Sequence, residues 1–371
     1  MAEIDLKYKI AFASVRGMGY DLAQKILDII PSEQEFFLMD ESELKAHLQI
    51  KSKIINSDYR HQLLQMAEKE IDFISRNNIG YVYFTDDNYP IRLTNAPDAP
   101  ILMYYKGDIS CLNANKVISI VGTRHATIYG QHFCDTLISD IADRLVDTVI
   151  VSGLAYGIDI SAHRAAMKNG IPTVAVLAHG LNMIYPSQHR NDAISIINQD
   201  GLLLTDYTSQ SVISRANFLA RNRIVAGLSD CTVVVESAEK GGAMTTAGIA
   251  ASYNRDVLAV PGKVSDIYSA GCNHLIRDNR ASLITNCEDL AKAMRWDMFG
   301  SETQPKQKTL FPEISPEEQP IIDYLRSHSD AHVNTICTTL KMPMPQLLNL
   351  LIDLEFKGVI LSAPGNKYSM A

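Results

Sequence analysis

Residues 117–151 read VISIVGTRHATIYGQHFCDTLISDIADRLVDTVIV, and this stretch decides the fold class. Two short apolar runs rich in β-branched residues, Val117–Val121 and Thr148–Val151, flank a helical pattern over Ala126–Leu145. Continuous apolar strands that alternate with helices are typical of a parallel sheet buried on both faces. The stretch therefore predicts an α/β unit.

The same alternation continues through the middle of the chain. Further strands are expected at Thr173–Leu177, Leu202–Thr205, Thr232–Val235 and Val257–Val260, and further helices at Ile158–Asn169, Arg215–Ala226 and Ala243–Tyr253. Right-handed crossovers place the functional loops of such a sheet at the carboxyl ends of its strands. We therefore expect an extended Rossmann-like parallel sheet.

The whole chain, of 371 residues, is too long for one ordinary core. We expect a helical domain that resembles SAM or helix-hairpin-helix modules, a connector rich in Pro and Asp, the Rossmann-like domain, a flexible linker and a winged helix. Their expected bounds are 1–80, 81–112, 113–297, 298–317 and 318–371.

Both flanking domains leave alternatives open. The glycines of the turn Arg16–Gly19 could offer N–H groups to a phosphate or cap helices, and the acidic surroundings favour the capping role. The expected third helix of the winged helix, Met344–Phe356, contains neither Arg nor Lys. A reader of the DNA groove needs such cations. We interpret this domain as a protein-contact or regulatory module, or as a very weak DNA binder.

The amino-acid composition limits the classes of protein to which the chain can belong. Hydrophobic residues make up 46% of the chain and charged residues 20%, which is typical of a globular protein. No apolar run approaches the ~20 residues of a membrane span, and no signal peptide is recognisable, so we expect a cytoplasmic protein. The six cysteines form no CxxC pair; we expect reduced thiols, no metal site and no disulfide.

The net charge of −8 argues at first against nucleic acid. Residues 113–297, however, hold 16 Lys and Arg against 17 Asp and Glu, a net charge of −1. Any contact with DNA must therefore come from a local cluster of arginines.

Several turns at the expected strand ends could bind an anion. They combine glycines, hydroxyl groups and helix N-termini, which attract phosphate. Their candidate residues are Gly122, Thr123, Arg124, Ser152, Gly153, Gly242 and Thr245. A further strand-end segment is Tyr185–Arg190.

The segment Arg215–Arg223 adds arginines around an aromatic ring. Its candidate residues are Arg215, Phe218, Arg221, Asn222 and Arg223. Arginines on phosphates and a ring under a base suit a single strand of nucleic acid. The same spacing also fits a helix whose Phe218 is buried and whose arginines are solvated, so this pattern alone leaves both interpretations open.

Catalytic motifs are missing from the sequence. It contains no GxxxxGK[ST] loop, no HExxH and no GxSxG elbow. Carboxylates near strand ends, such as Asp159, Asp206 and Glu236, more often cap turns, and His163 and His179 more often pack or face solvent than catalyse. We therefore expect neither an enzyme nor a cofactor.

Taken together, these segments resemble the DNA-processing protein A family (DprA, also called Smf). Residues 218–229, FLARNRIVAGLS, are similar to the family's FPxRNRIIAGLS. Residues 236–248, ESAEKGGAMTTAG, with Val260-Pro261-Gly262, are similar to its ESxxxSGSLxTAxxA and AVPG. SGLAYGIDISAH and the Tyr185-Pro186 turn match as well, so the resemblance densely covers residues 115–295.

The resemblance implies an extended Rossmann domain that binds single-stranded DNA, forms a homodimer and loads the recombinase RecA during natural transformation. It places strand contacts on Gly122, Thr123, Arg124, Arg215, Phe218 and the segment Arg221–Arg223. It also implies a dimer segment, GxNxLIxxGA, which appears here as Gly271–Ala281 with its Gly-Ala replaced and one extra residue.

Mixed polar and apolar residues in 273–283 suit a two-fold interface. Its expected members are Asn273, His274, Leu275 and Leu283. The resemblance implies that the recombinase binds a surface that overlaps this interface. The alternative is that these leucines belong to the domain's own core.

Two rival functions remain. Rossmann-like hydrolases of nucleoside monophosphates carry a PGGxGTxxE loop, whereas this chain has GGAMTTAG without the trailing Glu. A pure interaction scaffold is disfavoured by the arginines at the strand ends.

Overall fold

The computed structural model describes residues 1–371 except 1, 49–54, 299–313, 329, 364 and 371. Its centre is a nine-stranded sheet with the order β1-β2-β6-β5-β4-β3-β7-β8-β9. The strands are β1 (Gly80–Tyr83), β2 (Leu102–Gly107), β3 (Lys116–Val121), β4 (Thr148–Ser152), β5 (Thr173–Val176), β6 (Leu202–Thr205), β7 (Cys231–Val234), β8 (Asp256–Ala259) and β9 (Ser282–Leu283). Strands β3 to β9 are parallel, which confirms the Rossmann-like fold.

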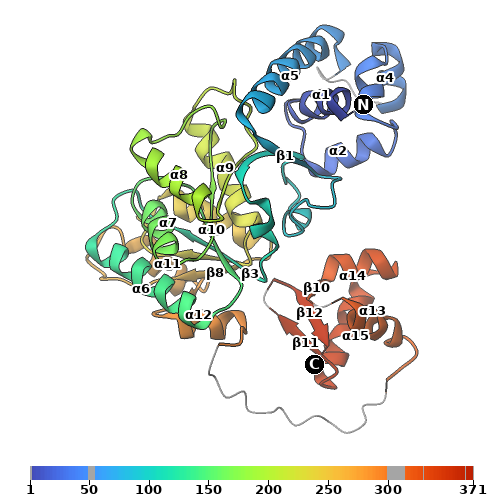
Figure 1. The fold of residues 1–371 in the computed structure, drawn as a ribbon. Coiled ribbons are helices and arrows are strands. Elements are labelled where there is room, and N and C mark those ends of the chain that lie inside the picture. The colour runs from blue at the N-terminus through green and yellow to red at the C-terminus, as the bar shows by residue number, and fades with distance from the viewer. Residues whose placement is uncertain (1, 49–54, 299–313, 329, 364, 371) are drawn as a thin grey trace.

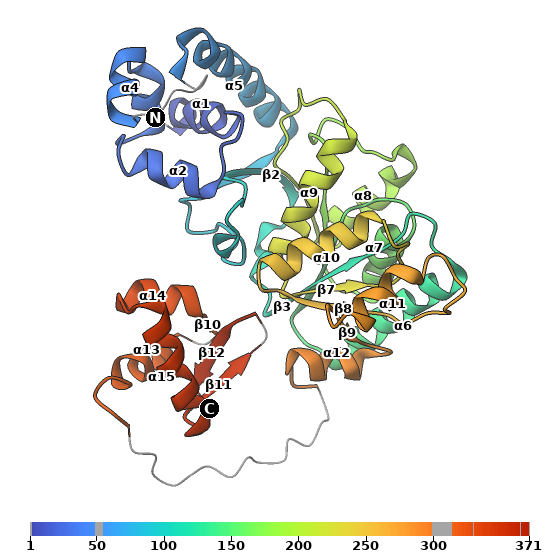
Figure 2. The ribbon, with the colours of Figure 1, turned by 180° about the vertical axis from the view of Figure 1, so that it is seen from behind.

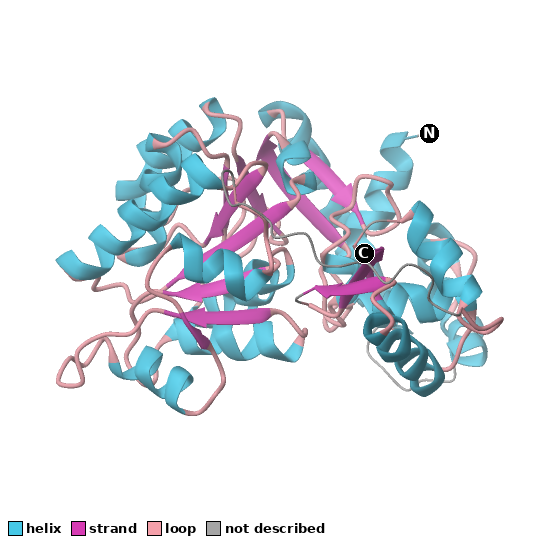
Figure 3. Ribbon diagram, turned by 90° about the horizontal axis from the view of Figure 1, so that it is seen from below, coloured by secondary structure: helices cyan, strands magenta, loops and turns pink. Residues whose placement is uncertain are grey.

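Helices cover both faces of this sheet (Figures 1, 2 and 3). They are α6 (Ile128–Arg144), α7 (Ile158–Lys168), α8 (Arg190–Asn198), α9 (Arg215–Gly227), α10 (Gly242–Ser252), α11 (Ala270–Arg277) and α12 (Cys287–Met294). Val149 and Val151 of β4 point to the core under α9, α10 and α11, whereas Ile150 points to the core under α6, α7 and α12. Burial on both faces explains why the strands are apolar throughout.

The segment expected as a connector, residues 81–112, contributes two strands to the sheet. β2 pairs antiparallel with β6, and β1 pairs antiparallel with β2, so the sheet is mixed. Between these strands Arg92 donates two hydrogen bonds to the Asp230 carboxylate, with N···O distances of 2.8 and 2.9 Å. This segment therefore belongs to the fold of the central domain.

The N-terminal part is a small helical group that shares its core with the sheet domain. Its helices are α1 (Ala2–Ala13), α2 (Tyr20–Leu27), α3 (Glu33–Leu38), α4 (Glu41–Leu48) and α5 (Ser57–Asn77). In the turn between α1 and α2, Gly17 has a φ of 84°, a backbone conformation that glycine adopts without strain. Glu70 of α5 accepts hydrogen bonds from Ser209 and so joins this group to the central domain.

The C-terminal part is a winged helix, as expected. It contains α13 (Gln319–Ser327), β10 (Ala331–His332), α14 (Val333–Leu340), α15 (Met344–Phe356), β11 (Ile360–Ala363) and β12 (Lys367–Met370), with the sheet order β10-β12-β11. Most of the expected linker, 298–317, lies outside the described residues.

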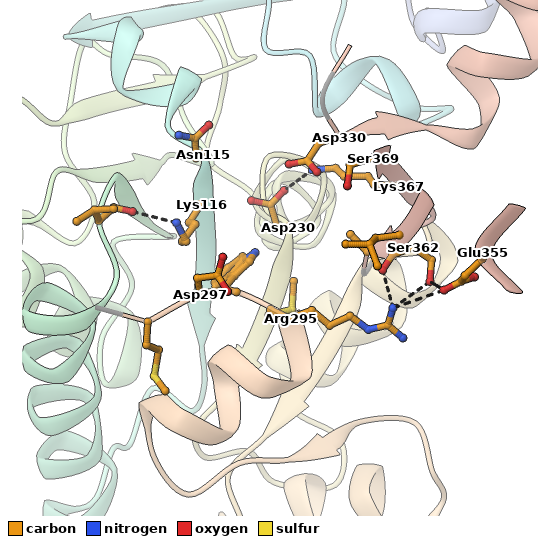
Figure 4. A pocket seen from close by; sticks show the side chains of 16 residues that line it. Asn115, Lys116, Asp230, Arg295, Asp297, Asp330, Glu355, Ser362, Lys367 and Ser369 are labelled. Atoms are coloured by element: carbon orange, nitrogen blue, oxygen red, sulfur yellow. Dashed lines mark hydrogen bonds and ion pairs between the residues drawn. The ribbon is translucent and has the colours of Figure 1, made fainter. Parts of the chain in front are cut away.

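A cleft of about 980 Å³ separates the winged helix from the central domain (Figure 4). Lys367 Nζ lies 3.1 Å from Asp230 Oδ1, and Arg295 donates to the Ser362 hydroxyl over 2.9 Å. Burial works against ionisation of Asp230, yet Arg92 and Lys367 hold the pKa of that carboxyl below its ordinary value. These contacts hold the wing against the sheet domain.

Candidate nucleic-acid interface

The candidate site lies where the strand order reverses. From β3 the chain winds outward through β4, β5 and β6, then returns to the other side of β3 with β7 and β8. Loops after β3, β4 and β7 meet at this switch point, where open α/β sheets bind their ligands. They line a pocket of about 90 Å³ together with α9. Of the candidate residues it contains Gly122, Arg124, Gly153, Phe218, Arg221, Asn222 and Gly242.

The loop after β3 is held in shape by its backbone. Thr123 N donates to Glu236 O over 2.7 Å, and Thr123 O accepts from Ile158 N over 3.1 Å. A side chain at Gly122 would begin 2.4 Å from Ile158 Cγ1, so this close approach requires glycine. Because the Thr123 backbone is already bonded within the protein, Thr123 positions the loop and Arg124 presents the charge.

Arg124 and two rings form the exposed part of the site. The Arg124 guanidinium lies 5.3 Å from the centre of the Phe218 ring, and the Tyr185 ring meets Phe218 edge-on with centroids 5.6 Å apart. Arg124 and Tyr185 are exposed, and Phe218 is partly buried. Phe218 therefore lines the pocket while part of its ring is buried.

The turn after β4 is mainly structural. Ser152 is fully buried and donates its hydroxyl proton to Ile120 O over 2.6 Å, which ties β4 to β3. Gly153 N donates to Asp159 Oδ2 over 3.2 Å. The expected anion-binding groups of Ser152 and Gly153 are thus already paired within the protein.

The arginines of α9 separate into different environments. Arg215 is exposed at the start of the helix. Arg221 is only 4% exposed and donates to Gly153 O, 2.8 Å away, and to Val176 O. Arg223 lies 2.5 Å from Asp206 Oδ2 in a partly buried ion pair. Of the expected arginine contacts on α9, Arg215 alone is exposed.

Burial shapes the charges beneath the site. It lowers the pKa of Arg221, and the carboxylate of Asp159 opposes this. It also raises the pKa of Asp159, which Arg221 opposes. Both side chains line the pocket, where Arg221 donates to Gly153 O and Asp159 accepts from Gly153 N.

Helix α10 offers its N-terminus beside the pocket. Gly242 is exposed, and the pocket is lined by Thr246 rather than by the expected Thr245. Thr245 is exposed next to it. The free N–H groups of a helix start favour an anion at this point.

Sequence reasoning left some surface aromatic residues out of the site. Tyr185, on the loop after β5, was within a segment noted for its position but was not assigned a contact. His125 and Tyr268 were not noted at all, although their rings stack with centroids 5.9 Å apart. The position of His125 directly after Arg124 is the signal that could have found it.

The expected assembly segment is only partly at the surface. Leu275 on α11 is 1% exposed and packs in the domain's own core, as the alternative interpretation had it. Asn273 exchanges hydrogen bonds with the backbone of Gly262, with N···O distances of 3.0 and 3.2 Å. His274 is partly exposed near Glu239. Leu283 is 48% exposed on the edge strand β9. Leu283 and His274 are thus the accessible members.

The described residues offer little catalytic chemistry. Within these ranges no group of three or more His, Cys, Asp or Glu side chains could hold a metal ion. All six cysteines are free thiols, and burial raises the pKa of Cys231 and Cys134 well above that of an exposed thiol. In the part of the chain that the structure covers, no helix is both long and apolar enough to cross a membrane.

Comparison with protein families identifies two regions. The family described as "DNA recombination-mediator protein A" matches residues 80–295, and the "DprA winged helix domain" matches residues 303–366. The first range begins at β1, which agrees with the inclusion of β1 and β2 in the central domain.

Individual relatives and solved structures agree. The chain is 39% identical over 205 residues to DNA processing protein DprA of Streptococcus pneumoniae, covering 55% of this chain and 71% of the relative. It is 31% identical over 305 residues to protein Smf of Escherichia coli, a match that covers 80% of this chain and 79% of the relative.

An X-ray structure of the S. pneumoniae protein superposes with a TM-score of 0.65 at 28% identity, over 77% of this chain and 95% of that one. A structure of DNA processing protein A from Helicobacter pylori, whose title describes its single-stranded DNA binding mode, superposes with a TM-score of 0.51 at 30% identity. It covers 57% of this chain and 94% of that one.

Proposed function

The chain belongs to the DNA recombination-mediator protein A family, and on this premise we propose that it binds single-stranded DNA at the switch point of its sheet. The DNA is held without chemical change and passed to a recombinase. The observation that carries the proposal is the cluster of the partly buried Phe218 ring with the exposed Arg124 and Tyr185 side chains.

The cluster combines the two kinds of group that a single strand needs. Arginines pair with phosphates whatever the sequence, and exposed rings stack on unpaired bases. Arg215 at the start of α9 and the N-terminus of α10 add positive potential. A duplex keeps its bases stacked on one another, so the rings favour single strands over duplex DNA.

The size of the pocket argues for a surface contact with a strand. Pockets that enclose small ligands typically measure about 300–1,000 Å³. The pocket of about 90 Å³ between the loops is far smaller. A nucleoside monophosphate would remain largely outside it, which disfavours the hydrolase and supports binding without catalysis.

Assembly and transfer to a recombinase complete the proposal. Leu283 exposes an apolar side chain on β9 at the edge of the sheet. An edge strand presents unpaired backbone groups to another chain. We assign this edge to a second copy of the chain in the homodimer, and the recombinase, RecA in the resemblance, to a surface that overlaps it.

Fluorescence anisotropy with labelled single-stranded and duplex oligonucleotides at several salt concentrations tests the binding. We expect preference for single strands and an affinity that falls as salt rises, because phosphate contacts release counterions. Arg124→Ala and Arg215→Ala should weaken binding, and Arg326→Ala provides a matched control because Arg326 is exposed on the winged helix. Equal affinity for all three variants and the wild type would refute the site.

A further inference from the structure

A second pair of rings includes His125, the residue that directly follows Arg124 in the chain. His125 is exposed, Tyr268 is half-buried, and their rings stack at an interplanar angle of 29° with centroids 5.9 Å apart. His125 follows Arg124 directly in the loop after β3, whereas Tyr268 comes from the loop between β8 and α11. Two loops from separate strands thus meet at this pair.

The protein holds both partners in place. Tyr268 O accepts from Ser237 N over 2.6 Å, and Tyr268 N donates to Asp266 Oδ1 over 2.9 Å. His125 N donates to the Thr123 hydroxyl over 3.1 Å. Rings whose backbone is fixed in this way lose little entropy when a base stacks on them.

We propose that His125 and Tyr268 form a second base-stacking site for single-stranded DNA. A strand bound at Phe218 and Tyr185 continues past Arg124 to this pair, and Arg124 contacts the backbone between the two sites. The inference rests on the proposed function and extends it to a longer footprint. Sequence-independent single-strand sites typically combine such ring series with intervening cations.

The charges around the second site suit a polyanion. Lys240 and Lys263 are exposed on the loops that flank it. Glu236 is buried, and its two carboxylate oxygens accept from Thr127 N and the Thr127 hydroxyl over 2.9 and 2.5 Å. Asp266 accepts from the Tyr268 backbone. Glu236 and Asp266 thus already bind protein donors, and both lysines face solvent.

The winged helix contains a pair of the same residue types that serves as a control. Tyr324 and His328 stack with centroids 4.3 Å apart, one turn from each other on and just after α13. This pair is equally a half-buried tyrosine and an exposed histidine. It is a local contact at one helix end, far from the switch-point loops (Figure 1).

The experiment measures affinity of the full chain for oligothymidylates of increasing length, from about 4 to about 16 nucleotides, the usual range of site sizes. For the longer oligomers we expect His125→Ala and Tyr268→Ala to weaken binding about five-fold or more, which corresponds to the loss of one stacked base. For the shortest oligomers, which occupy the Phe218 site alone, both variants should match the wild type. Tyr268→Phe should bind like the wild type because the ring is kept, and so should His328→Ala.

Each outcome of this experiment either supports or overturns the second stacking site. Equal affinity of His125→Ala and the wild type at every length overturns the second site, and so does an equal loss at all lengths. His125 is exposed, so His125→Ala should fold normally and measures the loss of stacking even where Tyr268→Ala lowers the melting temperature. Absence of binding by the wild type at every length would instead refute the proposed function itself.

Discussion

Replacing Arg221 should unfold the site, whereas replacing Arg215 should only weaken binding. The two arginines lie on the same helix, α9, within two turns of each other. Arg215 is exposed, and Arg221 is 4% exposed with its guanidinium bonded to Gly153 O and Val176 O. The contrast tests whether burial or sequence position decides the role of an arginine.

The structure sets the magnitude. Arg221→Ala removes the guanidinium donor from two buried carbonyls, Gly153 O and Val176 O, and removes the buried positive charge that favours ionisation of Asp159. Breaking a buried charge pair from one side costs about 3–5 kcal/mol. For a domain of ~150–250 residues each kcal/mol shifts the melting temperature by about 2–4 °C, so we expect a decrease of about 6–20 °C. Arg215→Ala should change stability by less than about 0.5 kcal/mol.

Thermal melting and salt-dependent binding measure both effects. Arg215→Ala should reduce the slope of log affinity against log salt by about 0.7, the value for one phosphate on a single strand. If Arg221→Ala melts like the wild type and loses affinity, Arg221 is a DNA contact after all, as the sequence suggested. If it melts like the wild type and binds like it, the buried network that we describe does not stabilise the site.

Further predictions concern the ring, the edge strand, the wing and a buried histidine. Phe218→Ala should lose about 1–3 kcal/mol of binding to single strands with an unchanged salt slope; a large loss of thermal stability would place Phe218 in the core instead. Leu283→Arg should give a folded monomer in sedimentation because Leu283 is 48% exposed, whereas Leu275→Arg should unfold the protein because Leu275 is 1% exposed. A dimeric Leu283→Arg variant would exclude β9 from the interface. Lys367→Glu should open the interdomain cleft and increase solvent quenching of the chain's single tryptophan, which lines it; unchanged quenching would contradict the ionic contact. Burial lowers the pKa of His163 to about 3. As the pH falls below about 6.5, the unfolded chain therefore binds a proton at His163 before the folded chain does, and the stability of the fold should decrease. His163→Asn should reduce this pH dependence of the melting temperature, and a profile identical to that of the wild type would show that His163 does not contribute.

The sequence was sufficient for the elements whose patterns are strong. The strand Leu202–Thr205 and the helix Met344–Phe356 have the bounds that their patterns predict. Strands buried on both faces and helices with a regular apolar face leave a periodic signal that needs no tertiary context. Strands β1 and β2 were missed because they are short and lie among Pro, Asp and Asn residues that signal loops.

The sequence named residues that the structure brings together at one pocket, but it did not give the partners of each side chain. Sequence places Arg221 among polar and charged neighbours, which suggests a solvated face. The structure turns its guanidinium inward to carbonyls at the ends of two strands that are distant in sequence. Such a partner exists only once the sheet has formed, so no local pattern could assign it. The same holds for Ser152 and for the contact between His125 and Tyr268.

Under the proposed function, the division between inward and outward arginines accounts for DNA binding by an acidic chain. Arg221 binds backbone carbonyls and thereby fixes α9 against the loops after β4 and β5. Fixed in this way, α9 presents Phe218 beside Arg124 and exposes Arg215 at its start. Such a site attracts duplex DNA weakly at long range, because the net charge of the chain is −8. In the proposed site, discrimination therefore depends on rings that only unpaired bases can reach.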